Sequence, residues 1–244
     1  MIDFIVWSRS NRNIVLIGGA VVIVVGYFIW DADVIGKLQA YRIEGAKKEQ
    51  IQSIAELTII RDDISEDMLT EYTEKFNGSR DIFLTNPGVE SYYAINNIAQ
   101  IKKLVGDLDG AEEAWIYAHE LSPNSYLVNG NLAQLYMFDL RNYEKAEEFY
   151  LKAIAPENIS GTGNLATYIS DLYTLYHDIE KDDAKAEGIL KRGLERLPDD
   201  TYLNFLTARF YRGKGDTVNA RRYYDKVVAL DPSNVIARKE LESL

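Results

Sequence analysis

Hydrophobic residues follow two different patterns along this chain. From Ile14 to Trp30, seventeen consecutive residues carry no charge. After Trp30, apolar residues recur at spacings of three and four among charged ones, which is the pattern of amphipathic helices. The pattern therefore predicts an all-α protein, in which one apolar segment precedes a long region of water-soluble helices.

The apolar run from Ile14 to Trp30 predicts a transmembrane helix. At about 1.5 Å of rise per residue it covers roughly 26 Å, near the lower limit for the core of a bilayer. Tyr27 and Trp30 close the run, so amphipathic rings stand where an aromatic belt would lie. We expect residues 1–13 to form an N-terminal flank and residues 14–30 to contact the lipid bilayer as a single-pass anchor.

A cleaved signal peptide is the alternative interpretation of this segment. Arg9 and Arg12 would form its basic start, but the run ends in the bulky residues 27–30, without the small-residue cleavage pattern. Orientation stays open, because basic residues lie on both sides: Arg9 and Arg12 before the run, Lys37 and Arg42 after it. We favour a cell membrane, plasma or inner, with the soluble domain outside the cytoplasm.

The remainder of the chain repeats with a period near 34 residues. In each repeat a small residue is followed four positions later by a large one and seven positions later by another short one. The small residues on which the repeats align are Ala111, Ala146, Ala186 and Ala220. Short residues seven apart share one helix face and let two helices pack closely. A proline follows in three repeats by twelve positions and ends the second helix. Such units cannot bury their own apolar face, so we expect them to stack.

These features resemble the tetratricopeptide repeat family over about residues 91–244. The best repeats are residues 92–125 and 201–234, which have the family's 34-residue length, although its early tryptophan is absent. The resemblance implies a right-handed helical solenoid over residues 86–244, with about four repeats and a closing helix.

Residues 31–85 precede the clear repeats and are expected to form a juxtamembrane helical segment. The apolar stripe predicts one long helix from Asp31 to about Arg61. A second helix is expected from Glu66 to about Phe76, capped by Asp63 or Ser65 and ended by the Asn-Gly-Ser sequence that follows.

Composition excludes several classes of site. A net charge of -11 disfavours nucleic acid as a partner, and zero Cys excludes thiolate zinc sites and cysteine nucleophiles. His119 and His177 have no ligand-spaced companions, and no phosphate-binding loop or nucleophile elbow occurs. We therefore expect no catalytic residues, metal, cofactor or small-molecule substrate, and expect that the protein is not an enzyme.

In tetratricopeptide stacks the first helix of each repeat lines the concave face, where partner peptides lie. The resemblance places thirteen side chains there: Tyr93, Asn96, Gln100, Lys103, Gln134, Met137, Phe138, Thr174, His177, Tyr202, Phe205, Arg209 and Arg212. Asn and Gln can hydrogen-bond an extended backbone, and the two arginines suit a carboxylate. The alternative is that these positions are only solvated helix faces.

The sequence thus favours a membrane-anchored adaptor or scaffold that mediates protein–protein interactions in a membrane-associated complex. The alternative is a chaperone-like or receptor subunit that binds unfolded or targeting segments near a protein-export or import machine. An enzyme, or the regulatory subunit of one, is a third hypothesis that no residue supports.

Overall fold

The computed structural model describes residues 45–85, 88, 91–155 and 164–244. The chain divides into two compact parts, Met1–Ser53 and Ile54–Leu244. The predicted transmembrane segment, Ile14 to Trp30, and its flank lie outside the described residues. Among the helices that are described, none is both long enough and apolar enough to cross a membrane.

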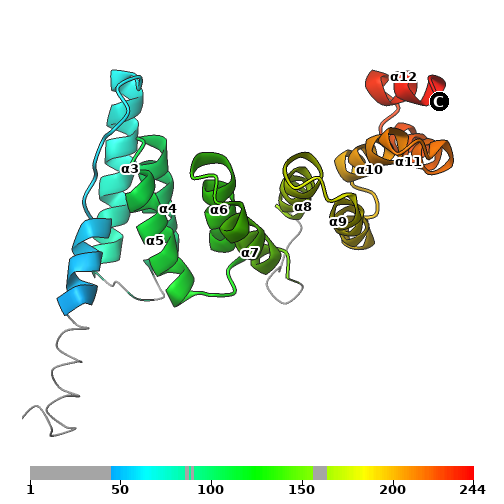
Figure 1. The fold of residues 1–244 in the computed structure, drawn as a ribbon. Helices are drawn as coiled ribbons and strands as arrows, with labels where there is room; N and C mark the ends of the chain where they lie inside the picture. Colours follow the sequence, from blue (N-terminus) through cyan, green and yellow to red (C-terminus); the bar gives the residue numbers. More distant parts are fainter. Residues whose placement is uncertain (1–44, 86–87, 89–90, 156–163) are drawn as a thin grey trace, which may run out of the picture. The chain divides into compact units, whose positions relative to one another are not determined.

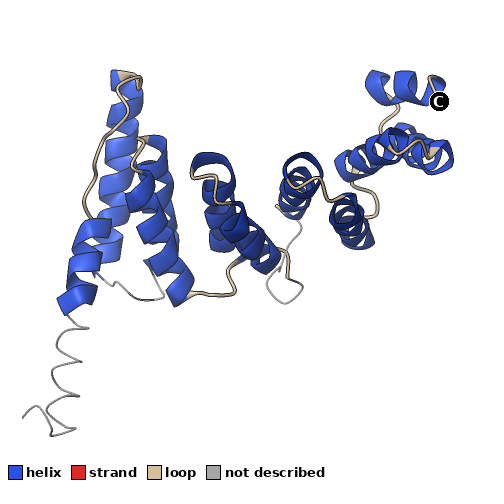
Figure 2. Ribbon diagram, in the orientation of Figure 1, coloured by secondary structure: helices blue, strands red, loops and turns tan. Residues whose placement is uncertain are grey.

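All regular structure in the described residues is helical (Figure 1; Figure 2). After α3, the helices pair in chain order as α4 with α5, α6 with α7, α8 with α9 and α10 with α11, which we call repeats one to four. The bounds are α3 Glu66–Thr85, α4 Tyr92–Leu104, α5 Leu108–Leu121, α6 Tyr126–Gln134, η2 Leu135–Asp139, α7 Tyr143–Ala153, α8 Leu165–Thr174, η4 Leu175–Ile179, α9 Asp183–Arg196, α10 Thr201–Gly213, α11 Thr217–Leu230 and α12 Val235–Glu242. The prediction of an all-α stack of helical hairpins is confirmed.

The turn inside each repeat follows one local rule. A residue with positive φ ends the first helix, and the next residue caps the second with its side chain. The positive-φ residues are Gly106, Arg141, Lys181 and Gly215, and the caps are Asp107, Asn142, Asp182 and Asp216. Each cap accepts a hydrogen bond from the backbone N–H three residues on. These polar turns therefore set the start of every second helix.

The small residues that define the repeat lie in the core. Ala111, Ala146, Ala186 and Ala220 are all 0% exposed. The large residues four positions later are buried too: Trp115, Tyr150, Leu190 and Tyr224. This arrangement confirms that small side chains let the second helix approach the first, while large ones fill the space beside them.

Repeats two and three contain one residue more than repeats one and four at the end of the first helix. Thirteen positions separate Ala133 from Ala146, whereas twelve separate Ala99 from Ala111. The additional residue is accommodated by the π-helical turns η2 and η4, in which backbone hydrogen bonds reach five residues back. The second helices therefore keep their place in the stack.

The helix predicted to run to about Arg61 ends earlier than expected. Residues 45–54 are helical, so the prediction of a continuous helix to Arg61 is wrong. Beyond the helix, the backbone N–H groups of Ile60 and Arg61 donate to the carbonyl oxygen of Val105, at 2.9 and 3.0 Å. These bonds attach the segment to the end of α4 and take the place of helical ones.

The next helix, α3, is longer than expected. It runs over Glu66–Thr85, so the prediction that it ends near Phe76 is wrong. Phe76, Ser79 and Phe83 are buried along one face, and the ring of Phe83 meets that of Tyr117 edge-on at 5.8 Å. Burial of this stripe outweighs the helix-breaking tendency of the Asn-Gly-Ser sequence.

The closing helix α12 covers part of repeat four. Ala237 is buried and Leu241 packs on the cluster that includes Tyr224 and Val227, so the predicted closing helix is present. Val235, at the start of this helix, is 54% exposed. With one buried residue, this short helix is held by few apolar contacts.

Candidate partner-binding face

Polar side chains on the first helices join successive repeats. Between repeats one and two, the side-chain oxygen of Asn96 accepts hydrogen bonds from Trp115 Nε1 at 3.0 Å and from Asn131 Nδ2 at 2.7 Å. Asn96 is only 3% exposed. It therefore fixes two repeats together and does not line an open groove, contrary to the prediction.

A half-buried carboxylate joins repeats two and three. Asp171 Oδ2 accepts from Gln134 Nε2 at 3.1 Å and from the hydroxyl of Tyr150 at 2.8 Å. Burial raises the pKa of Asp171 above its usual value, although both donors oppose this shift. Burial also raises the pKa of the Tyr150 hydroxyl, so this group stays a donor. Gln134, a predicted partner contact, is thus occupied within the chain.

The two arginines of α10 already hold a carboxylate. Glu240 of α12 lies 3.3 Å from Arg212 Nη1 and 3.9 Å from Arg209 Nε, and it accepts a hydrogen bond from the Tyr224 hydroxyl. The sequence predicts that these arginines hold a carboxylate of a partner. In the structure they hold the carboxylate of Glu240, which belongs to the same chain. Both arginine side chains stay substantially exposed, at 60% and 43%.

His177 and Lys103 also have partners within the chain. His177 Nδ1 lies 3.0 Å from Asp183 Oδ1, and its ring stacks on Tyr173. Hydrogen bonds from Lys214 and then His177 lower the pKa of Asp183. Lys103 pairs with Asp139 at 2.7 Å. Across the described ranges, no group of three acidic or histidine side chains is placed to hold a metal ion.

Three aromatic side chains on the first helices remain open to solvent. Tyr93 on α4 is 70% exposed, Phe138 on η2 is 54% exposed and Tyr202 on α10 is 55% exposed. Gln100 is exposed as well, whereas Thr174 and Phe205 are half-buried and Met137 is buried. Met137 therefore belongs to the core and does not line an open face. We call Tyr93, Gln100, Phe138, Tyr202, Arg209 and Arg212 the open first-helix face.

Sequence reasoning missed Asp171 and Glu240 as members of this region. Asn131, Asp171 and Glu240 stand at the same repeat position, and each contacts the preceding repeat. A polar residue recurring at one position was the available signal. It could not be interpreted without knowing which side chains of the preceding helix lie opposite.

One family model matches two segments of this chain. The model described as tetratricopeptide repeat matches residues 127–155 and 202–234, which lie in repeats two and four. These two segments therefore match tetratricopeptide repeats. A comparison with curated proteins gives no match.

Solved structures with the same architecture extend this result. The structure described as YrrB, a TPR protein with an unusual peptide-binding site, has a TM-score of 0.52 and 19% identity, covering 68% of this chain and 80% of that one. A MamA structure has a TM-score of 0.50 and 21% identity, covering 62% and 78%. The pilF protein of Pseudomonas aeruginosa has a TM-score of 0.54 and 16% identity, covering 82% and 89%. These similarities confirm the fold, an all-α tetratricopeptide-type solenoid.

Proposed function

We propose that this chain of tetratricopeptide repeats is a membrane-anchored adaptor without catalytic activity. Its open first-helix face binds a segment of a partner protein, and the predicted helix from Ile14 to Trp30 ties the repeats to a cell membrane. The exposed aromatic side chains on that face carry the proposal.

Large aromatic rings left in solvent are the main reason to assign binding to this face. Tyr93, Phe138 and Tyr202 lie on the first helices of three different repeats and are each more than half exposed. Tyrosine and phenylalanine are enriched at protein interfaces, where they supply much of the binding energy. Gln100 and the exposed faces of Arg209 and Arg212 add donors for the backbone or carboxylates of a bound segment. The peptide-binding site named for YrrB, which shares the fold, is consistent with such a role.

Site-specific photo-cross-linking in cells tests this assignment. We expect full-length protein carrying photoreactive p-benzoylphenylalanine in place of Tyr93 or Phe138 to form a cross-linked adduct with one partner protein. The same amino acid in place of Leu151 should not do so, because Leu151 is an exposed apolar residue (38%) on the second helix α7. Adducts are detected by gel shift and identified by mass spectrometry.

The outcomes separate the two functional classes. One reproducible adduct from the first-helix positions supports the adaptor. A broad set of unrelated adducts would instead favour the chaperone-like or receptor role near a protein-export or import machine. Equal cross-linking from Leu151 would show that the first helices are not the binding face.

A cysteine-labelling experiment tests the anchor and its orientation. The natural chain has no cysteine, and Asn124 lies exposed in the turn before α6, so Asn124→Cys creates a single accessible thiol. Neighbouring Ser125 is less suitable because its hydroxyl caps α6. We expect the variant to fractionate with membranes and to react with a membrane-impermeant maleimide in intact cells. Labelling only after lysis would place the repeats in the cytoplasm, and release of the full-length protein without detergent would contradict the anchor.

A further inference from the structure

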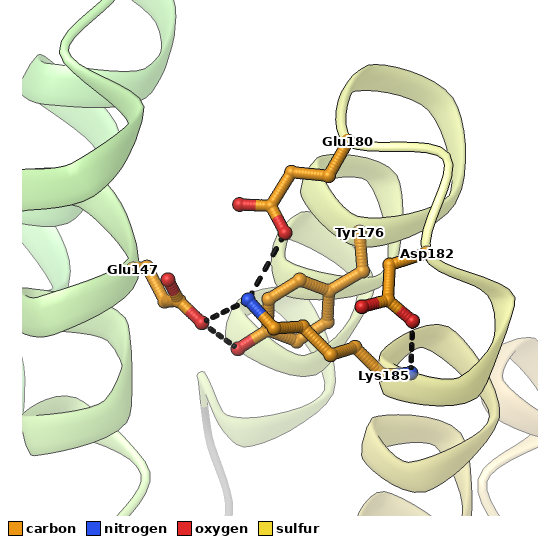
Figure 3. A network of polar contacts seen from close by, with 5 residues as sticks. All are labelled: Glu147, Tyr176, Glu180, Asp182 and Lys185. Atoms are coloured by element: carbon orange, nitrogen blue, oxygen red, sulfur yellow. Dashed lines mark hydrogen bonds and ion pairs between the residues drawn. The ribbon is translucent and has the colours of Figure 1, made fainter.

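A network of polar contacts joins repeats two and three on the second-helix side (Figure 3). The hydroxyl of Tyr176 donates to Glu147 Oε1 at 2.9 Å, and Lys185 Nζ donates to the same oxygen at 3.0 Å. The ammonium of Lys185 also lies 4.8 Å from the centre of the Tyr176 ring and 3.1 Å from Glu180 Oε2. Asp182 fixes the start of α9, because its carboxylate accepts from the backbone N–H of Lys185 at 3.0 Å. A lysine therefore fills the space between the glutamate and the tyrosine ring.

The junction of repeats one and two has the same network. Tyr136 donates to Glu112 Oε1 at 2.5 Å, and Lys145 Nζ donates to that oxygen at 3.1 Å. Lys145 again lies over the tyrosine, 4.6 Å from the ring centre. Two junctions thus place a lysine, three residues after the cap of the second helix, against the tyrosine of its own repeat and the glutamate of the preceding one.

The junction of repeats three and four keeps the tyrosine and glutamate but replaces the lysine. Tyr211 donates to Glu187 Oε1 at 2.8 Å. Asn219 stands where Lys145 and Lys185 stand in the other repeats, and its Nδ2 donates to Asp216 Oδ2 at 2.6 Å. Lys191, on the same helix as Glu187, pairs with that carboxylate at 2.5 Å instead. The cation that pairs with this glutamate therefore comes from α9, and the lysine position of α11 holds the shorter side chain of Asn219.

A pocket of about 510 Å³ lies at this junction, and its size is in the range that admits a ligand group. It includes the counterparts of all three network members, which are Glu187 of repeat three and Tyr211 and Asn219 of repeat four. The lining residues are Glu187, Lys191, Phe210, Tyr211, Lys214, Asp216, Asn219, Arg222 and Tyr223. The rings of Tyr211 and Tyr223 stack at 5.8 Å with an interplanar angle of 4°. The lining of the pocket therefore combines two tyrosine rings with charged side chains.

The charges around the pocket favour an anion. Its lining contains Lys191, Lys214 and Arg222 against two carboxylates, although the whole chain carries -11. Lys191 pairs with Glu187 and Lys214 with Asp183, but Arg222 has no carboxylate partner among the described residues. Its guanidinium lies over Tyr223, 5.5 Å from the ring centre. The carboxylate of Asp216 is occupied by its own capping bonds, which lower its pKa.

We propose that this pocket, which we call the α9–α11 pocket, binds an aromatic side chain flanked by acidic residues in a partner protein. The partner's ring packs against Tyr211 and Tyr223, where such ring pairs are favourable. A flanking carboxylate pairs with Arg222, whose planar guanidinium suits bidentate contact with a carboxylate. This site is on the second-helix side and does not depend on the function proposed for the open first-helix face.

Two photoreactive tripeptides serve as probes of the α9–α11 pocket. Each carries p-benzoylphenylalanine between two glutamates or, in the comparison peptide, between two lysines, with both ends blocked. With the full-length protein we expect the acidic peptide to label residues of α9, α10 and α11, as mapped by mass spectrometry. Because the lining favours anions, its labelling at about 1 mM should exceed that of the basic peptide by about tenfold.

Two substitutions test whether the pocket itself is responsible. Asn219→Lys restores the lysine of the other junctions and fills the space, while Arg222→Gln removes the unpaired cation from an exposed position. Each should reduce labelling by about tenfold. Arg221→Gln, at the adjacent exposed arginine outside the lining, is the matched control and should leave labelling unchanged.

Circular dichroism verifies that each variant remains helical. Equal labelling by both peptides, or labelling that survives Asn219→Lys and Arg222→Gln in folded protein, would overturn the proposal. The experiment measures which residues are labelled. Its result therefore does not depend on whether a partner binds the open first-helix face.

Discussion

Replacing Lys102 with methionine is expected to lower the free energy of unfolding by about 3–5 kcal/mol, the usual cost of removing one partner from a buried ion pair. Lys102 Nζ lies 3.0 Å from Asp107 Oδ2, and the two side chains are only 3% and 13% exposed. Methionine keeps an unbranched stem but leaves the buried carboxylate without its cation. Chemical denaturation of the full-length protein, followed by circular dichroism, measures the change.

The same lysine attaches the segment that precedes the repeats. Its ammonium donates to the carbonyl oxygen of Glu56 at 2.5 Å, and Asp107 also caps α5 through the backbone N–H of Gly110. One substitution therefore weakens a helix start and a tertiary contact together.

Lys75→Met is the matched control for this prediction. Lys75 pairs with Glu71 at 2.5 Å, but these side chains are 63% and 57% exposed. Exposed pairs contribute about 0–1 kcal/mol, so this variant should unfold almost as the natural protein does. A loss below about 1 kcal/mol for Lys102→Met would show that the buried pair does not stabilise the fold.

The second large effect is expected at Gly130. A β-carbon added there would lie 2.0 Å from Cζ and 2.2 Å from the hydroxyl oxygen of Tyr168. Tyr168 is 2% exposed and packs beside Tyr150, so its ring cannot swing into solvent. Gly130→Ala should therefore force α6 and α8 apart and lower the free energy of unfolding by about 1–3 kcal/mol.

Gly188→Ala should act in the opposite direction. Gly188 lies inside α9, is exposed, and has no atom within 4 Å of an added β-carbon. Alanine is the better helix former by about 1 kcal/mol, so this variant should be slightly more stable. Thermal and denaturant unfolding of both variants gives the comparison. Equal changes in the two would contradict the close approach of Tyr168 to α6.

The elements that sequence predicted correctly depend on local chemistry. Small residues seven positions apart mark every second helix, and a proline marks the end of three of them; the small residues are buried as expected. Each signal acts within a few residues, so the chain order of hairpins could be derived without tertiary information. The length of α3 could not, because burial of Phe83 beneath Tyr117 outweighs the breaking tendency of Gly78.

The candidate site was predicted only in part for the same reason. Tyr93, Phe138 and Tyr202 are exposed as the repeat position implied, but Asn96 and Met137 face neighbouring helices. The α9–α11 pocket was not predicted at all. Asn219 occupies a position that is lysine in repeats two and three, and this difference is visible in the sequence. It can be interpreted only when the structure shows that each lysine contacts a glutamate and a tyrosine at its junction.

The π-helical turns η2 and η4 allow a repeat of this kind to gain or lose one residue. Inserting one residue into a regular helix rotates everything after it by about 100° about the helix axis. Here two repeats carry an additional residue between the tyrosine and the cap, yet Ala146 and Ala186, which follow it, are as fully buried as Ala111 and Ala220. Lys145 and Lys185, which also follow it, reach the glutamates of the preceding repeats. The end of the first helix is therefore a place where a single-codon insertion or deletion can be accepted during evolution while the contacts between repeats are preserved.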